Sequence, residues 1–195
     1  MSEPDAPTNK EEDEYAAYAL LEEGRYKEAF EKYRPLAELG SLIAQINLGW
    51  MYHKGRGIPQ DFEAAERWYR RAEGSNPPEG QFYLGTLYRT QKQYERALEC
   101  FERSASQDFM PALHALGKMY NTGQGVDIDK AKAYSYFAQA AQRGHLPSKR
   151  EIAVQMMKGH HGVACIPQGV YRFIRIFWPA LQLFWKDPAD ERGRW

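Results

Sequence analysis

The side chains best suited to bind a metal ion lie in one short segment, where His160 and His161 are followed by Cys165. Imidazole and thiolate groups are ligands that zinc prefers, but a structural zinc site needs about four of them. No second cysteine or carboxylate completes such a set at a recognisable spacing, so we expect no metal site and no cofactor. The sequence also lacks a nucleophile motif and a phosphate-binding loop, so it offers no catalytic residues and predicts a non-enzymatic protein.

Two Gly-x-Gly segments, Gly55 to Gly57 and Gly123 to Gly125, could be taken for part of a dinucleotide-binding loop. A dinucleotide site needs that loop between a strand and a helix, and no strand pattern precedes either segment. Glycines also allow positive φ angles in a turn. We therefore assign both segments to turns between helices, with Asp61 and Asp129 as the N-caps that follow them.

A Leu-Gly pair recurs along the chain with a regular spacing. Its copies begin at Leu48, Leu84 and Leu116, which are 36 and 32 residues apart. The longer interval occurs where a Gly-x-Gly follows the pair, which indicates one structural unit with an optional four-residue insertion in its turn. Self-similarity at this period predicts a helical solenoid.

The second half of each unit carries a small residue followed four positions later by an aromatic one. Residues four apart share a helix face. The small residue lets two helices approach, and the aromatic ring fills the space one turn further on, so the pattern predicts packing rather than catalysis. The pairs are Ala29 and Tyr33, Ala65 and Tyr69, Ala97 and Phe101, and Ala133 and Phe137.

Taken together, these motifs resemble the Sel-one-like repeat, a relative of the tetratricopeptide repeat. One copy of the family pattern is met by Ala44, Leu48-Gly49, Met51-Tyr52, Gly55, Gly57, Asp61, Ala64, Trp68-Tyr69 and Ala72. Another is met by Ala112, Leu116-Gly117, Met119-Tyr120, Gly123, Gly125, Asp129, Ala133 and Ala140-Ala141. The resemblance covers about Glu11 to Met157 and implies an all-α, right-handed α-solenoid of about five helix-turn-helix repeats. Because the family's members are commonly scaffolds, including bacterial ones, it also implies binding to a protein or peptide partner.

Composition narrows the class of partner. The chain has 26 Lys and Arg against 26 Asp and Glu, so it lacks the basic patch expected of a nucleic-acid-binding protein. Its polar, acidic start does not resemble a secretory signal, and two cysteines without a repeat spacing argue against a disulfide framework. We therefore expect a cytoplasmic protein, with membrane association left open by its apolar end.

The chain divides into four segments on this interpretation. Residues 1–10 form an acidic, disordered leader, residues 11–165 the repeat domain, residues 166–186 an apolar C-terminal helix, and residues 187–195 a polar tail. Ile166-Pro167-Gln168 repeats Ile58-Pro59-Gln60, so the apolar segment takes the place of a second helix in a fifth, degenerate repeat.

That C-terminal helix is apolar on nearly every face, which is typical of a buried or interfacial helix. It could cap the solenoid, form a homodimer or partner interface, or lie in a bilayer surface as a peripheral contact. Its stretch from Val170 to Trp185 contains two arginines and Pro179, and is too short to span a bilayer. The candidate interface or membrane residues are Phe173, Ile174, Phe177, Trp178, Leu181 and Trp185.

In related helical repeats the first helix of each pair lines the concave face of the solenoid. Outward positions on those helices form a mixed aromatic and polar row, which suits an extended peptide or a partner helix. The alternative is that several of these side chains pack between neighbouring repeats. The candidate partner-binding residues are Trp50, His53, Phe82, Thr86, Arg89, His114, Lys118, Asn121 and Met157.

Overall fold

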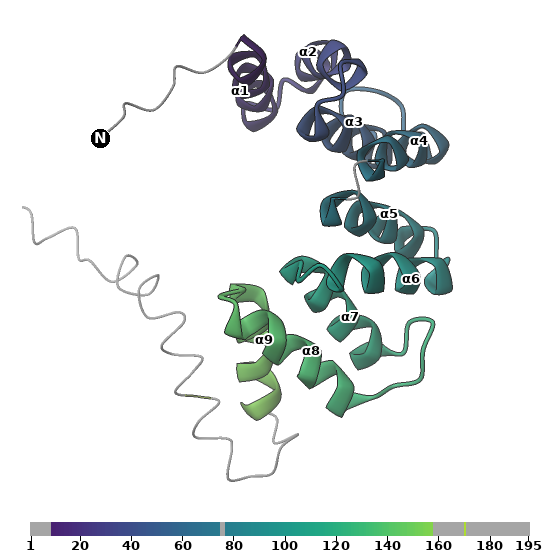
Figure 1. Ribbon diagram of the computed structural model, residues 1–195, viewed down its shortest axis with the longest axis vertical. Coiled ribbons are helices and arrows are strands. Elements are labelled where there is room, and N and C mark those ends of the chain that lie inside the picture. The colour runs from purple at the N-terminus through teal and green to yellow at the C-terminus, as the bar shows by residue number, and fades with distance from the viewer. Residues whose placement is uncertain (1–8, 75–76, 158–169, 171–195) are drawn as a thin grey trace, which may run out of the picture. The chain divides into compact units, whose positions relative to one another are not determined.

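The computed structural model describes residues 9–74, 77–157 and 170, and within these ranges it contains nine α-helices and no strand (Figure 1). The helices are α1 (Asn9–Glu22), α2 (Tyr26–Glu38), α3 (Leu42–Lys54), α4 (Phe62–Glu73), α5 (Pro78–Thr90), α6 (Tyr94–Ala105), α7 (Met110–Thr122), α8 (Lys130–Gln142) and α9 (Leu146–Met157). The predicted all-α repeat is confirmed. α1 begins at Asn9, slightly before the start at Glu11 that the sequence suggested.

The described chain divides into two compact units between Ala112 and Leu113, inside α7. In unit 1 each helix from α1 to α5 packs against the one that follows it, and the first helices α3 and α5 also contact each other. In unit 2, α8 packs against α9, and α7 meets α8 where Gly117 faces Phe137. The helices therefore pair as the repeat pattern predicts.

The predicted N-caps begin the helices that follow the long turns. The Asp61 carboxylate accepts a hydrogen bond of 2.9 Å from the backbone amide of Ala64. The Asp129 carboxylate accepts one of 2.8 Å from the backbone amide of Lys132. These bonds satisfy amides that have no partner inside the helix. Both caps are confirmed.

Turns of two lengths join the paired helices. The long turns use Gly55, Gly57, Gly123 and Gly125, all with positive φ angles as predicted. The short turn between α5 and α6 instead places Lys92 at φ 61°, a conformation that side chains other than glycine adopt less readily. The helices on either side pack in the same way after both kinds of turn.

Each glycine of the Leu-Gly pairs faces the aromatic ring of the following second helix. A Cβ atom added at Gly49 would lie 2.5 Å from a ring carbon of Tyr69, and one at Gly117 would lie 2.5 Å from Phe137. The corresponding distance from Gly85 to Phe101 is 2.7 Å. A side chain at any of these positions would collide with the ring, so the glycines serve close helix packing.

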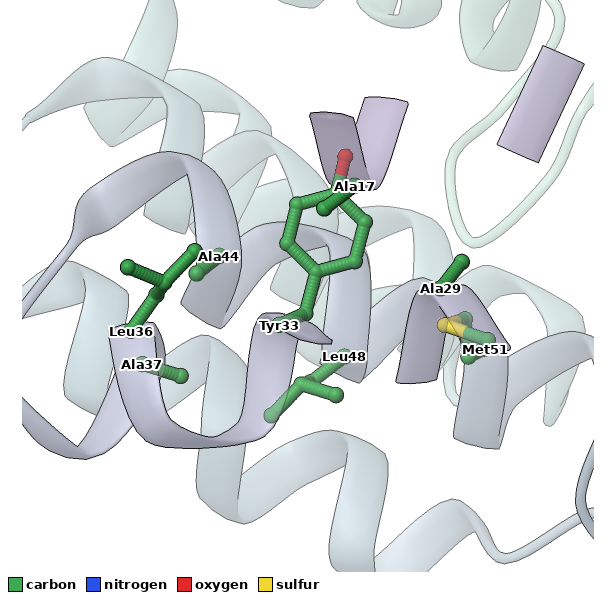
Figure 2. Close-up of a cluster of buried hydrophobic side chains, with 8 residues drawn as sticks. All are labelled: Ala17, Ala29, Tyr33, Leu36, Ala37, Ala44, Leu48 and Met51. Carbon is green, nitrogen blue, oxygen red and sulfur yellow. The ribbon is translucent and has the colours of Figure 1, made fainter. Parts of the chain in front are cut away.

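Alanine replaces this glycine in the first repeat, and the core there is built around Tyr33. Figure 2 shows the Tyr33 side chain among small and aliphatic residues from α1, α2 and α3, with its ring directed toward Ala17. The Tyr33 ring is fully buried, and burial is the main cause that raises its pKa to about 12. Its hydroxyl has no hydrogen-bond partner among the described residues. The ring therefore stabilises this repeat by packing.

Candidate partner-binding face

Three positions on each first helix lie on one side of that helix, because they are separated by four and then three residues. They are occupied by Glu14, Tyr18 and Leu21 in α1, by Ile46, Trp50 and His53 in α3, by Phe82, Thr86 and Arg89 in α5, by His114, Lys118 and Asn121 in α7, and by Arg150, Val154 and Met157 in α9. The predicted partner-binding residues all belong to this set. The environment of each differs, so each unit is described in turn.

In unit 1, Trp50 is half-buried. Its ring lies 6.4 Å from the ring of Tyr26, and it packs against the core cluster of the first repeat. Part of the indole is therefore structural, and the remainder is accessible at the surface. Trp50 therefore lies at the predicted outward position and also packs between neighbouring repeats, which was the alternative interpretation.

His53 does not lie at the surface, contrary to its expected outward position. Its side chain is 1% exposed, and its Nε2 atom lies 3.1 Å from Oγ1 of Thr90 in α5. Burial, with a smaller contribution from Lys54, lowers the pKa of the imidazole to about 4, so the ring is neutral near pH 7. Because α3 and α5 contact each other here, this position is covered by the next repeat and links the two helices.

The α5 positions combine an aromatic ring, a hydroxyl and a cation. The half-buried Phe82 ring lies 5.8 Å from Phe101 and 5.5 Å from Phe109. The Thr86 hydroxyl donates to the Phe82 carbonyl oxygen of its own helix at 3.0 Å. The guanidinium of Arg89, also half-buried, lies 5.6 Å from the centre of the Phe101 ring. Arg89 therefore places a cation against this aromatic cluster.

In unit 2, His114 belongs to a cluster of polar and aromatic groups. Its half-buried ring lies 5.3 Å from Phe137 and 5.2 Å from His145. The Nδ1 atoms of His114 and His145 lie 3.0 and 2.9 Å from the same hydroxyl, that of Ser148. Ser148 is fully buried, so this arrangement joins α7 to α9 and gives a substrate no access to its hydroxyl.

The other predicted positions in unit 2 are half-buried or exposed. Lys118 is half-buried, and Met157 is 38% exposed. The Asn121 side-chain oxygen accepts a hydrogen bond of 3.0 Å from the ammonium group of Lys130, which also donates to the Asn121 carbonyl oxygen at 2.6 Å. Asn121 therefore holds the start of α8 as well as lying on the predicted row.

Sequence reasoning missed Tyr18, which occupies in α1 the position that Trp50 occupies in α3. Its side chain is 53% exposed. The signal was available, because Tyr18 precedes Trp50 by the 32-residue period. We select five of the accessible or half-buried residues at these positions and call them the first-helix row of unit 1: Tyr18, Trp50, Phe82, Thr86 and Arg89.

A polar network that joins three helices was also missed. One carboxylate oxygen of Glu66 accepts hydrogen bonds from the Tyr88 hydroxyl at 2.7 Å and from Arg70 at 2.9 Å. Arg96 lies over the Tyr88 ring, 3.9 Å from its centre, and donates to the Tyr88 oxygen. Burial alone would raise the pKa of Glu66, but the hydrogen bonds from Tyr88 and Arg70 lower it overall. The network ties α4, α5 and α6 together.

Neither a metal centre nor a membrane span is found in the part of the chain that the structure describes. Within it, no three His, Cys, Asp or Glu side chains converge to hold a metal ion. None of its helices combines the length and the apolar character needed to cross a bilayer. His160, His161 and Cys165 lie outside the described residues, as do all six candidate residues of the C-terminal helix.

Paired helices, three of them joined by a glycine–aromatic contact, define an α-solenoid of helical repeats. The Sel1 repeat family matches residues 42–73, 78–109 and 111–145. The chain therefore belongs to the Sel1 repeat family, as its motifs suggested.

Similar proteins agree with this assignment. A solved Sel1 repeat protein from Oxalobacter formigenes has 26% sequence identity and a TM-score of 0.69, over 89% of this chain and 75% of that one. The uncharacterized protein NMB1327 of Neisseria meningitidis serogroup B is 35% identical over 62% of this chain and 26% of its own length. HRD3B of Arabidopsis thaliana, an ERAD-associated E3 ubiquitin-protein ligase component, is 30% identical over 61% of this chain and 22% of its own. The chain thus spans about a quarter of these two relatives.

Proposed function

We propose that this protein is a non-enzymatic scaffold that binds a peptide or a partner protein on the first-helix row of unit 1. The observation that carries the proposal is the composition of that row. It presents Tyr, Trp and Arg side chains that are accessible or half-buried, and these residue types dominate the energetics of protein interfaces. HRD3B, whose name describes a component of a larger ligase, supports an assembly role for a chain of this family.

His114, Lys118, Asn121 and Met157 form a second proposed contact region, within unit 2. Asn121 and His114 already make structural contacts, so we expect Lys118 and Met157 to contribute more of the binding there. His53 is left out of the proposed surface, because its buried ring is not accessible to a partner.

Two tryptophans in similar environments allow a sharp test. Trp50 of the row and Trp68 of α4 are both half-buried and pack against the same core cluster. Peptides are selected from a random displayed library on the full chain and then titrated against Trp50→Ala and Trp68→Ala. We expect Trp50→Ala to weaken binding by about tenfold or more, and Trp68→Ala to leave it within about threefold of wild type.

Thermal unfolding of both variants provides the control for this experiment. If both lose similar stability and only Trp50→Ala loses binding, the row carries the interaction. Equal loss of binding in the two variants, or unfolding of Trp50→Ala alone, would show that the indole is structural and would exclude this binding surface.

We propose as a second candidate a peripheral membrane factor recruited by the apolar segment that contains Phe173, Phe177 and Trp185 in the sequence. Aromatic residues flanked by arginines suit the headgroup region of a bilayer. Sedimentation with liposomes of the full chain, beside a chain ending at Gln168, tests this candidate. Liposome binding that is lost with the truncation supports it, and absence of binding by the full chain excludes it.

A further inference from the structure

Arg89 is exceptional among the arginines that the structure describes. The other arginines in the described ranges are exposed, whereas Arg89 is half-buried. No described carboxylate, carbonyl or hydroxyl oxygen accepts a hydrogen bond from its guanidinium, which lies over the Phe101 ring instead. The most buried arginine is thus one without an anionic partner in the described part of the chain.

Several exposed arginines of the same unit pair with carboxylates instead. Arg25 pairs with Glu28 at 2.6 Å, and Arg103 pairs with Glu73 at 2.9 Å. Water could solvate these two cations without their partners, so the pairs contribute little to stability. A partly desolvated cation gains far more from a carboxylate, because a charge removed from water is costly unless it is paired.

The surroundings of Arg89 favour an anion from outside the chain. Burial is the cause that lowers the pKa of its guanidinium, and no carboxylate of the described chain offsets this effect. The imidazole of His53 lies within hydrogen-bond distance of Thr90, the residue that follows Arg89 in the sequence, and it is neutral, so it adds no charge there. Phe82 supplies an apolar surface on the same side of α5.

Resting on the proposed function, we infer that Arg89 binds a carboxylate of the partner, and that the partner is a peptide segment with an Asp or Glu flanked by apolar residues. The planar guanidinium can donate two parallel hydrogen bonds to such a carboxylate. The flanking apolar residues of the peptide contact Phe82 and the accessible part of Trp50. This assigns a charge preference to the first-helix row.

The test uses peptides selected from a random displayed library on the full wild-type chain. We expect the selected peptides to share an Asp or Glu at one position, and its change to Asn or Gln to weaken binding by about tenfold or more. With Arg89→Met the acid and amide peptides should bind alike, whereas Arg89→Lys should keep part of the preference. Arg71→Met is the matched control, because Arg71 also lies over an aromatic ring, 4.9 Å from that of Trp68, but is exposed.

The outcomes separate this inference from the proposed function. Selected peptides without a shared acid, or an acid preference that survives Arg89→Met, would overturn the inference and leave a peptide-binding row intact. Failure to select any peptide would overturn both. If Arg89→Met does not fold by circular dichroism, Arg89→Gln replaces it in the same comparison.

Discussion

The same place in two successive repeats holds an apolar cluster in unit 1 and a titratable cluster in unit 2. In unit 1 the rings of Phe82, Phe101 and Phe109 pack together. In unit 2 the equivalent positions are His114, Phe137 and His145, with ring distances of 5.3 and 5.2 Å in place of 5.8 and 5.5 Å.

The geometry of this cluster is therefore kept while its chemistry changes. The phenylalanine of the second helix, Phe101 or Phe137, is fully buried in both units and faces a glycine of the first helix. The other two positions hold phenylalanine in unit 1 and histidine in unit 2, and the polar rings need hydrogen-bond partners. In unit 2 the Ser148 hydroxyl supplies them, since both histidines lie within hydrogen-bond distance of it.

The largest effect is expected when the second-helix phenylalanine, which is present in both clusters, is replaced. Phe101→Ala and Phe137→Ala should each cost about 3–5 kcal/mol of local stability, because each leaves a cavity at a fully buried site. Amide hydrogen exchange should show the loss in α5 and α6 for Phe101→Ala, and in α8 and α9 for Phe137→Ala. A cost below about 1 kcal/mol in either unit would mean that the two clusters are not equivalent.

A side chain on the facing glycine tests the same contact from the other helix. Gly85→Leu and Gly117→Leu should each destabilise the protein by about 1–3 kcal/mol, because the new side chain collides with the ring. Urea unfolding measures the effect. Gly24→Leu is an unsuitable control, since its positive φ adds strain, whereas Ala138→Leu changes a half-buried helix position and should be much milder.

Acid should destabilise unit 1 through His53 rather than through its phenylalanines. The folded pKa of His53 is about 4, below the ordinary value of about 6.5, so unfolding takes up a proton between these values. The stabilisation is complete above about pH 6.5 and is lost as the pH falls to about 4, by about 1–3 kcal/mol. Hydrogen exchange of α3 and α5 as a function of pH measures it, and His53→Gln should remove most of the slope.

A smaller acid effect is expected in unit 2, because His145 is only half-buried. Burial lowers its folded pKa, so its contribution is present above the unfolded value and declines as the pH falls below it. His145→Phe copies Phe109 and should reduce the pH dependence of exchange in α9, while the Ser148 hydroxyl keeps His114. If the pH dependence of hydrogen exchange in α9 is unchanged in this variant, protonation of His145 does not affect the stability of α9.

The features that could be predicted from the sequence depend on residues that lie close together within one repeat. Helix pairs, the caps at Asp61 and Asp129, and the glycine–aromatic contacts all follow from spacing within one repeat. His53 could not be placed in this way, because its burial depends on Thr90, which belongs to the next repeat. The joining of His114 to His145 through Ser148 likewise depends on a contact between α7 and α9.

The sequence predicted which helix positions form the candidate face. It did not predict which of those side chains are accessible and which are structural. Trp50 and Arg89 occupy the expected row, but their degree of burial is set by Tyr26 and Phe101, which come from second helices. Tyr18 was overlooked because its helix lacks the Leu-Gly pair that marked the others. A period of 32 residues, applied to every position, would have found it.

The two turn lengths have a consequence for protein engineering. The turn with Gly55 and Gly57 and the shorter turn with Lys92 join helix pairs that pack alike, and Gly49 and Gly85 meet their rings at nearly the same distance. Length added at this turn is thus compatible with the glycine–aromatic contact of the pair, and in the longer turn the added residues pack against α2, since a Cβ atom at Gly57 would lie 2.7 Å from Tyr26. A foreign recognition sequence grafted between α5 and α6 should therefore leave the packing of Gly85 against Phe101 in place, which makes this turn an insertion point for new binding specificity.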